Sequence, residues 1–177
     1  MILQKYKIVF AGSIGSGKTQ AIKSLSEVPV LATEVLNTDH ESHKKMETTV
    51  GIDYGEVTLE DGNKIGLYGT PGQDRFNFMW GVICKGAIGI IILVDHSLKN
   101  PLEELRHYID IFKNFSDNIA IGITHIDQDS NKSTHQYKQW LIDNDHQYPL
   151  FFIDARQQDE VLMLIESLII TLEIKYL

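Results

Sequence analysis

A glycine-rich segment near the start of the chain has the residue types and spacing of a phosphate-binding loop. Its residues are Gly12, Ser13, Ile14, Gly15, Ser16, Gly17, Lys18 and Thr19, which match Gly-x-x-x-x-Gly-Lys-Thr/Ser at every specified position. Glycines let successive N–H groups surround a polyphosphate, and the following helix adds the positive end of its dipole. In such loops the lysine reaches the β- and γ-phosphates and the threonine hydroxyl binds Mg²⁺. We therefore predict a site for a nucleoside di- or triphosphate.

The segments on either side of the loop support this interpretation. Residues 6–11 are apolar and rich in β-forming types, which predicts a buried strand. Residues 20–25 carry apolar side chains at helical spacing and predict a helix, in which Gln20 directly follows the loop and is expected to line the nucleotide. Strand, glycine loop and helix form the context in which this motif marks a site.

Composition narrows the class of protein. The length of 177 residues favours a single domain spanning residues 1–177, and the net charge of −8 argues against binding to nucleic acid or an anionic membrane. Cys84 is the only cysteine, so no intrachain disulfide can form, which fits a reducing compartment. From the first and last residues given we expect neither a signal peptide nor a lipidation motif, and the longest apolar run, 87–94, is too short to span a bilayer. We expect a cytoplasmic protein without a direct membrane anchor.

The rest of the chain predicts an α/β fold in which strands and helices alternate. Residues 50–59 and 64–68 form an antiparallel hairpin around the turn Asp61-Gly62. The β-branched run 87–94 indicates a strand buried on both faces. Further strands are expected at 118–124 and 150–153, and helices after Phe76, from Asn100-Pro101, from a capping box of Ser133 and Gln136, and around Val161–Leu172. This order predicts a six-stranded, mostly parallel mixed sheet with helices on both faces.

Taken with the loop and the hairpin, the segment Gly69-Thr70-Pro71-Gly72-Gln73 makes the chain resemble the Ras-like small GTPases over essentially its whole length. The stretch from Tyr68 to Phe76, followed by Met79-Trp80, most resembles bacterial members of the conservon and cell-polarity (gliding) type. The resemblance implies the small G-protein version of the P-loop NTPase fold. It also implies a switch that binds GTP, GDP and Mg²⁺, with a protein effector and a roadblock-type regulatory protein as partners.

The same resemblance assigns the two switch segments. Thr49, in Thr48-Thr49-Val50-Gly51, is expected to bind Mg²⁺ together with Thr19 and to sense the γ-phosphate. The N–H of Gly72 is expected to meet the γ-phosphate and Gln73 to orient the attacking water, so Gln73, Lys18 and Thr49 are the expected catalytic residues.

One position of the second switch departs from the family, because Gly69 stands where an aspartate usually supports the metal. Asp53 and Asp95 are candidates to replace it, although we prefer ordinary roles for both, Asp53 as a surface strand residue and Asp95 as a cap at a strand end. His40 and His43 suggest a metal site, but exposed loop histidines are the better interpretation.

Base recognition in the family rests on Asn-Lys-x-Asp, and here Thr124-His125-Ile126-Asp127 takes its place. The resemblance implies that Asp127 accepts two hydrogen bonds from guanine, Thr124 keeps part of the asparagine's role, and His125 stacks on the base. Asp154-Ala155-Arg156 stands where the family has Ser-Ala-Lys, so the Ala155 N–H is expected at guanine O6, with Arg156 beside it. An ordinary strand-to-helix turn is an equal alternative for that tripeptide.

Two features bear on hydrolysis and partners. Ile14 stands where fast GTPases often carry glycine and would crowd Gln73, so we expect slow intrinsic hydrolysis that is stimulated by a partner. The apolar segment 76–80 is a candidate partner surface, with core packing expected for about half of its large side chains. Two alternatives stay open: a nucleotide-binding scaffold without turnover, and a protein that binds or hydrolyses ATP.

Overall fold

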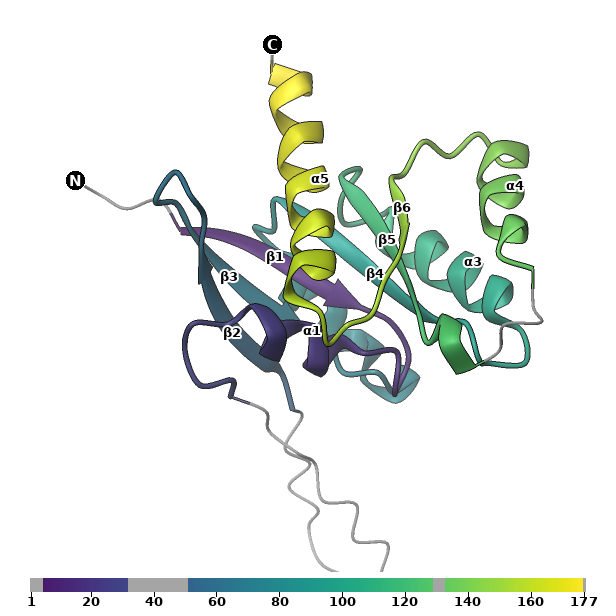
Figure 1. Cartoon of the computed structure of the whole chain (residues 1–177), viewed down its shortest axis with the longest axis horizontal. Coiled ribbons are helices and arrows are strands. Elements are labelled where there is room, and N and C mark those ends of the chain that lie inside the picture. Colours follow the sequence, from purple (N-terminus) through teal and green to yellow (C-terminus); the bar gives the residue numbers. More distant parts are fainter. Residues whose placement is uncertain (1–4, 32–50, 129–132, 177) are drawn as a thin grey trace, which may run out of the picture.

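The computed structural model describes residues 5–31, 51–128 and 133–176. Thr48, Thr49, His40 and His43 lie outside these residues, so the predictions made for them are not addressed by the structure. The described elements are β1 (Lys5–Ala11), α1 (Lys18–Leu25), β2 (Asp53–Thr58), β3 (Lys64–Gly69), η1 (Asp74–Met79), α2 (Trp80–Cys84), β4 (Gly89–Asp95), α3 (Pro101–Phe112), β5 (Ile119–Thr124), η2 (Ile126–Gln128), α4 (His135–Asp143), β6 (Leu150–Phe152) and α5 (Gln158–Tyr176) (Figure 1).

Within the described residues six strands form one sheet in the order β2-β3-β1-β4-β5-β6. β2 pairs antiparallel with β3, whereas the pairs β1–β3, β1–β4, β4–β5 and β5–β6 are all parallel. The hairpin turns at Gly62, whose φ of 84° lies in the left-handed region that glycine adopts without strain. The predicted mixed, mostly parallel sheet is therefore confirmed.

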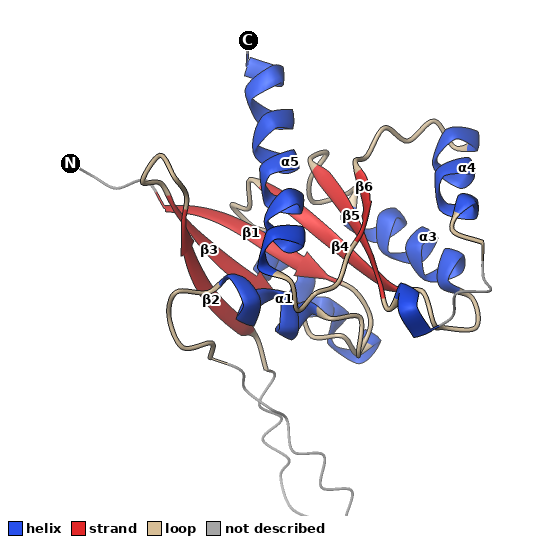
Figure 2. Ribbon diagram, viewed as in Figure 1, coloured by secondary structure: helices blue, strands red, loops and turns tan. Residues whose placement is uncertain are grey.

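An apolar core lies on each face of the sheet, formed by side chains of the strands and of the helices that pack on that face (Figure 2). On one face α2, α3 and α4 contribute large rings, among them Trp80, Phe112 and Tyr137. On the other face α1 and α5 pack aliphatic side chains such as Ile22 and Leu164. β4 lies between these layers and is buried along its length except at its last residue, Asp95, as its continuous β-branched pattern predicted.

Local signals at helix starts succeeded in one case and failed in another. α3 begins at Pro101 after Asn100, as predicted. The capping box expected at Ser133 and Gln136 is wrong, because α4 begins at His135 with Thr134 as its N-cap. Gln136 is therefore one residue too close to the cap to reach back to it, and Ser133 Oγ instead accepts a hydrogen bond of 3.3 Å from the His135 N–H.

The segment after the second switch divides between core and surface as expected. Phe76 and Trp80 are buried, whereas the side chains of Phe78 and Val82 are 69% and 74% exposed. The Trp80 indole N–H donates to the Pro71 carbonyl at 3.2 Å, which ties α2 to the second switch. Among the described helices, none combines the length and the apolar character needed to cross a bilayer.

Candidate nucleotide-binding site

The phosphate loop joins β1 to α1 at the carboxyl end of the parallel strands (Figure 1), where sheets of this architecture bind ligands. Gly12, Gly15 and Gly17 have φ values of 145°, 80° and 102°, so three of the loop residues need the left-handed region. At Gly12 a Cβ would lie 2.3 Å from the Leu93 carbonyl oxygen of β4, which leaves no room for any side chain. The loop shape therefore depends on glycine for both conformation and space.

Lys18 is buried beneath this loop. Its Nζ donates to the carbonyl oxygens of Gly12 and Ser13, each at 2.7 Å. Burial lowers the pKa of its ammonium to about 8, while the carboxylates of Asp53 and Glu104 act in the opposite direction. A buried cation whose charge is penalised in this way is stabilised by any anion that enters the loop.

The Thr19 hydroxyl, next to Lys18, donates a hydrogen bond to Oδ2 of Asp53 at the start of β2. Our preferred sequence interpretation of Asp53 as a plain surface strand residue is therefore wrong, because its carboxylate is turned toward the loop. A hydroxyl and a carboxylate are hard oxygen groups of the kind that Mg²⁺ prefers, so the residues at this point fit that ion.

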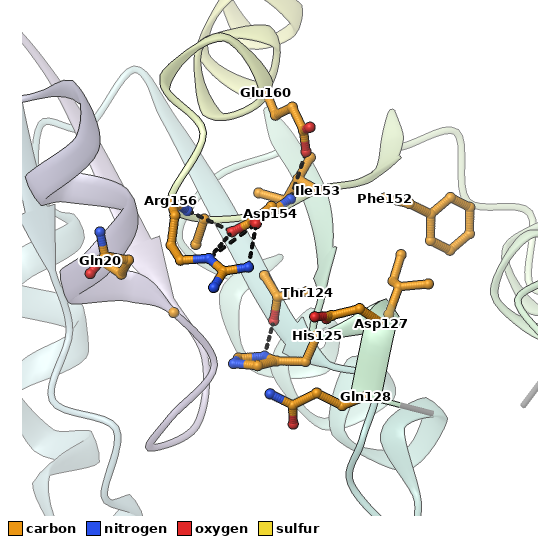
Figure 3. Close-up of a pocket in the computed structure, with 13 residues that line it drawn as sticks. Gln20, Thr124, His125, Asp127, Gln128, Phe152, Ile153, Asp154, Arg156 and Glu160 are labelled. Carbon is orange, nitrogen blue, oxygen red and sulfur yellow. Dashed lines mark hydrogen bonds and ion pairs between the residues drawn. The ribbon is translucent and has the colours of Figure 1, made fainter. Parts of the chain in front are cut away.

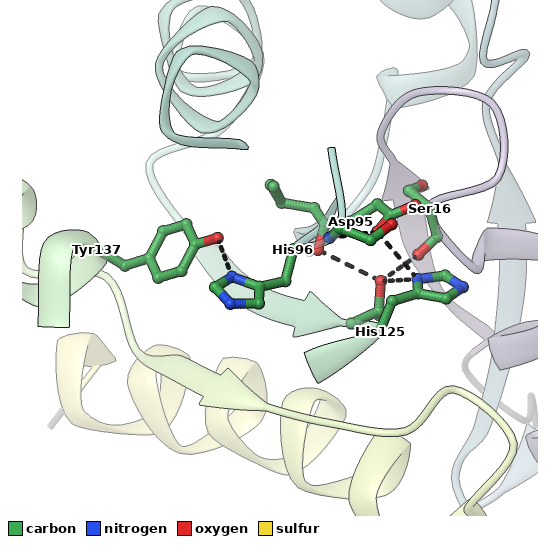
Figure 4. Close-up of polar contacts among 8 residues, drawn as sticks. Ser16, Asp95, His96, His125 and Tyr137 are labelled. Carbon is green, nitrogen blue, oxygen red and sulfur yellow. Dashed lines mark hydrogen bonds and ion pairs between the residues drawn. The ribbon is translucent and has the colours of Figure 1, made fainter. Parts of the chain in front are cut away.

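Asp95, the other candidate, behaves as the strand-end cap that the sequence predicted. Its Oδ1 accepts hydrogen bonds from the backbone N–H and the hydroxyl of Ser97, at 2.8 and 2.6 Å. The same oxygen lies 3.5 Å from Nδ1 of His125 (Figure 4). The Asp95 carboxylate therefore contacts the turn between β4 and α3 and the segment that follows β5.

The segment predicted to be the second switch, residues 69–73, lies directly against the phosphate loop. A Cβ built on Gly72 would be 2.7 Å from the backbone nitrogen of Ile14 and 2.9 Å from the carbonyl carbon of Ser13, so the two backbones touch at this position. Gln73 follows as the half-buried N-cap of η1. The Ile14 side chain is 65% exposed at the same end of the loop. The structure therefore brings together the residues predicted to meet the γ-phosphate and the attacking water.

A cavity of about 460 Å³ opens beside the loop (Figure 3). Three segments far apart in the sequence surround it: the loop with the start of α1, the residues after β5, and the turn between β6 and α5. The predicted nucleotide-binding residues that line it are Gly17, Gln20, Thr124, His125, Asp127, Ala155 and Arg156. Sequence reasoning did not identify four further lining residues, Gln128, Phe152, Ile153 and Glu160. Of these, Glu160 carries a signal, an acid in the first turn of a predicted helix.

Thr124 joins this cavity to the phosphate loop. It is buried, and its Oγ1 lies 2.9 Å from the Ser16 carbonyl oxygen, 3.3 Å from that of Val94 and 2.9 Å from Nδ1 of His125 (Figure 4). His125 takes a left-handed conformation with φ of 57° that non-glycine residues rarely adopt. The hydroxyl of Thr124 thus holds the loop and the His125 ring in place.

The opposite wall of the cavity is fixed by an ion pair. The Arg156 guanidinium donates to both oxygens of Asp154, with Nη2 2.7 Å from Oδ2, and these bonds lower the pKa of Asp154 to about 2. The Asp154 N–H donates to Glu160 of α5 at 2.6 Å. Ala155, between Asp154 and Arg156, packs on the phosphate loop. A Cβ built on Gly17 would lie 3.1 Å from the Cβ of Ala155. The tripeptide is therefore a hydrogen-bonded turn that packs against the phosphate loop.

Comparison with known proteins agrees with this geometry. No protein-family model matches the chain. The chain is 31% identical over 107 residues to Ras-related protein Rab-8A of Gallus gallus, covering 59% of this chain and 46% of that protein. It is 33% identical over 91 residues to an uncharacterized protein of Methanocaldococcus jannaschii, covering 51% of each. It is 23% identical over 165 residues to Ras-related protein Rab-13 of Rattus norvegicus, covering 88% and 74%. The chain thus spans about half the length of the first two relatives.

Among solved structures, the G domain of the T. maritima FeoB iron transporter matches with a TM-score of 0.67. The match covers 94% of this chain and 98% of that domain at 19% identity. The fold is therefore that of a G domain of the P-loop NTPase class. Together with the similarity to Ras-related proteins, it supports the P-loop GTPase superfamily, whereas the resemblance to the conservon and cell-polarity type stays a prediction.

Proposed function

We propose that this chain binds GTP and GDP with Mg²⁺ and acts as a slow GTP-hydrolysing switch. The observation that carries the proposal is the meeting of three parts at one end of the sheet: the phosphate loop, the Gly72 backbone against it, and the cavity that contains Asp127. The phosphate loop fits a polyphosphate, the Gly72 backbone fits its terminal phosphate, and the cavity fits a base.

At the phosphate end, the backbone N–H groups of the loop and the Lys18 ammonium bind the polyphosphate. Thr19 and Thr49 are the residues that would hold Mg²⁺, which supplies charge neutralisation to the β- and γ-phosphates. The lowered pKa of Lys18 supports this role, because the ammonium sits where an anion would repay the cost of its burial.

At the base end, Asp127 lies at the mouth of the cavity on η2, after β5. A carboxylate accepts two hydrogen bonds from the N1–H and the exocyclic amine of guanine, whereas adenine offers no such pair. His125 and Arg156 border the same space (Figure 3), which supports a flat base lying between the two segments. Guanine is therefore the proposed base.

We expect Asp127→Asn to reduce the preference for guanine over adenine about 10- to 100-fold, since a bidentate pair contributes about 1–3 kcal/mol of discrimination. The measurement is a titration of nucleotide-free protein with GTP, GDP, ATP and ADP, each with Mg²⁺. Gln128→Ala, in the same cavity, is the control and should keep the preference. Equal binding of ATP and GTP by the unaltered chain would favour the ATP-binding alternative, and an unchanged preference in Asp127→Asn would remove this residue from base selection.

Hydrolysis is proposed to be slow because Ile14 lies against Gly72, the residue before Gln73. We expect Ile14→Gly to raise the single-turnover rate about 10- to 100-fold, the range by which small misplacements of reacting groups change rates. Adding Gln73→Ala to Ile14→Gly should abolish this gain, since the glutamine then no longer positions water. Near-zero rates that neither change alters would instead favour a nucleotide-binding scaffold without turnover.

As a switch, the chain would present its second-switch side to a protein effector. The exposed apolar side chains of Ile14, Phe78 and Val82 are the residues that we propose to contact this effector. The finer assignment, to a cytoplasmic member of the bacterial conservon and cell-polarity type with a roadblock-type regulatory protein, belongs to the same proposal. Binding of a partner to the GTP form and not to the GDP form would support it.

A further inference from the structure

The carboxylate of Asp53 lies at a place that the side chain of residue 69 would otherwise occupy. We propose that Asp53 is the residue that positions Thr19 on Mg²⁺ in this chain, and that Gly69 is glycine because the Asp53 carboxylate fills its side-chain space. The inference rests on the proposed function, since it assumes that the loop binds nucleotide with Mg²⁺. It transfers a metal-supporting role from β3 to the neighbouring strand, β2.

Strand register brings the two positions together. β2 and β3 pair antiparallel, and Asp53 is the direct partner of Gly69 at the end of the ladder nearest the phosphate loop. Directly opposed residues of an antiparallel pair project to the same face of the sheet. A carboxylate on either residue can therefore approach α1 from nearly the same direction.

The space at Gly69 is already taken. A Cβ added there would lie 3.0 Å from Cβ of Asp53 and 3.2 Å from its Oδ2, with Cδ1 of Ile22 also at 3.2 Å. A larger side chain would extend further into these same atoms. Gly69 and Asp53 are thus complementary: the absence of a side chain on one strand admits the carboxylate from the other.

The chemistry follows from the contact that Asp53 makes. The Thr19 hydroxyl has one proton and two lone pairs, and its proton is donated to Oδ2 of Asp53. A lone pair is then left to face a cation, and the nearby carboxylate adds negative charge to the place where that cation would bind. Groups that orient a metal ligand in this way typically change metal affinity about 10- to 100-fold when they are replaced.

The competing carboxylate is already used elsewhere. Asp95 accepts two hydrogen bonds from Ser97 and lies beside His125, as described above. Its role is to end β4 and to hold the segment after β5. Asp95→Asn is therefore a matched control, because it removes the same charge from the same end of the sheet without touching Thr19.

The test measures how Mg²⁺ controls release of a fluorescent GDP analogue. For the unaltered chain we expect release to slow as Mg²⁺ is added, with a midpoint concentration that reports the metal site. In Asp53→Asn this midpoint should rise about 10- to 100-fold, whereas Asp95→Asn should leave it within about threefold. Each midpoint is read against the release rate of the same variant in excess EDTA, because Asp95 lies beside His125 of the cavity and its replacement can change metal-free release.

A strand swap supplies the readout that a merely structural role would not move. Asp53→Gly alone should raise the Mg²⁺ midpoint, and adding Gly69→Asp should bring it back toward the unaltered value, because the carboxylate returns from the opposite strand. Glycine, rather than alanine, is used at position 53 because the two Cβ atoms would otherwise be 3.0 Å apart. Urea unfolding of each variant without nucleotide identifies any that fails to fold. If Asp53→Gly alone does not fold, the Mg²⁺ midpoint of the double variant is compared directly with that of the unaltered chain.

The outcomes separate the two proposals. If the unaltered chain binds no guanine nucleotide, or releases it at one rate with and without Mg²⁺, the proposed function is overturned. If the unaltered chain shows the Mg²⁺ effect but Asp53→Asn has the same midpoint, and the swap restores nothing, Asp53 does not position the metal ligand. A raised midpoint with recovery in the swap supports the inference.

Discussion

Replacing Lys18 with methionine is expected to lower the affinity for GDP at least about 10-fold while the chain stays folded. The ammonium would make one or two hydrogen bonds to phosphate, and bonds to charged groups contribute about 1.5–3 kcal/mol each. Methionine keeps much of the buried stem and removes the cation together with its hydrogen bonds to the Gly12 and Ser13 carbonyl oxygens. Because burial already lowers the pKa of this ammonium to about 8, the unliganded fold gains little from its charge.

The measurement is direct titration with a fluorescent GDP analogue at neutral pH, paired with urea unfolding of the same sample without nucleotide. Lys23→Met is the matched control, since Lys23 is an exposed residue in the last turn of the same helix, α1. It changes the net charge by the same amount and should leave GDP affinity nearly unaltered. Equal affinities for the two variants would show that the loop does not use Lys18 to bind phosphate.

Replacing Gly12 with alanine is expected to destabilise the unliganded fold by about 2–6 kcal/mol. The range combines about 1–3 kcal/mol for a non-glycine residue in a sparsely populated backbone region with about 1–3 kcal/mol for overpacking. Both causes are present, because Gly12 has φ of 145° and its Cβ would lie 2.3 Å from the Leu93 carbonyl oxygen and 2.6 Å from Oγ of Ser16. A domain with a typical total stability of about 5–15 kcal/mol would lose much of it.

Gly15→Ala separates the two causes. Gly15 lies in the same loop with φ of 80°, but no atom lies within 4 Å of the position its Cβ would take. It should therefore carry only the conformational cost, about 1–2 kcal/mol. Urea unfolding of both variants without nucleotide gives the comparison. If Gly12→Ala were no less stable than Gly15→Ala, the close approach of the loop to β4 would contribute nothing to the fold.

Local sequence patterns predicted the fold well because they report short-range physics. The β-branched run before Asp95 indicated a strand buried on both faces, and Asp61-Gly62 marked the hairpin turn. The capping box at Ser133 failed because a serine side chain has several nearby backbone groups to bond, and here Ser133 Oγ accepts from the His135 N–H, at the first residue of α4.

The candidate site was predicted in its parts but not in its arrangement. Motif resemblance predicted Asp127 and Arg156 as nucleotide-binding residues. Only the arrangement of β5, β6 and α5 places them around one cavity. Gln128, Phe152 and Ile153 gave no signal of their own, because a wall residue of a cavity differs from a core residue only by what lies opposite to it. Glu160 acts on the cavity through the Asp154 backbone, a contact that spacing alone does not specify.

The sequence alone did not determine the role of Asp53. By itself the sequence determined a phosphate loop, because glycine spacing, the lysine and the threonine are local requirements of backbone conformation and charge. It also showed that residue 69 is a glycine, but not which group lies beside it. Only the tertiary structure decided that, since the register of β2 on β3 and the packing of α1 on β2 set the distance between residues 19, 53 and 69. Those distances depend on long-range pairing, which no local pattern encodes.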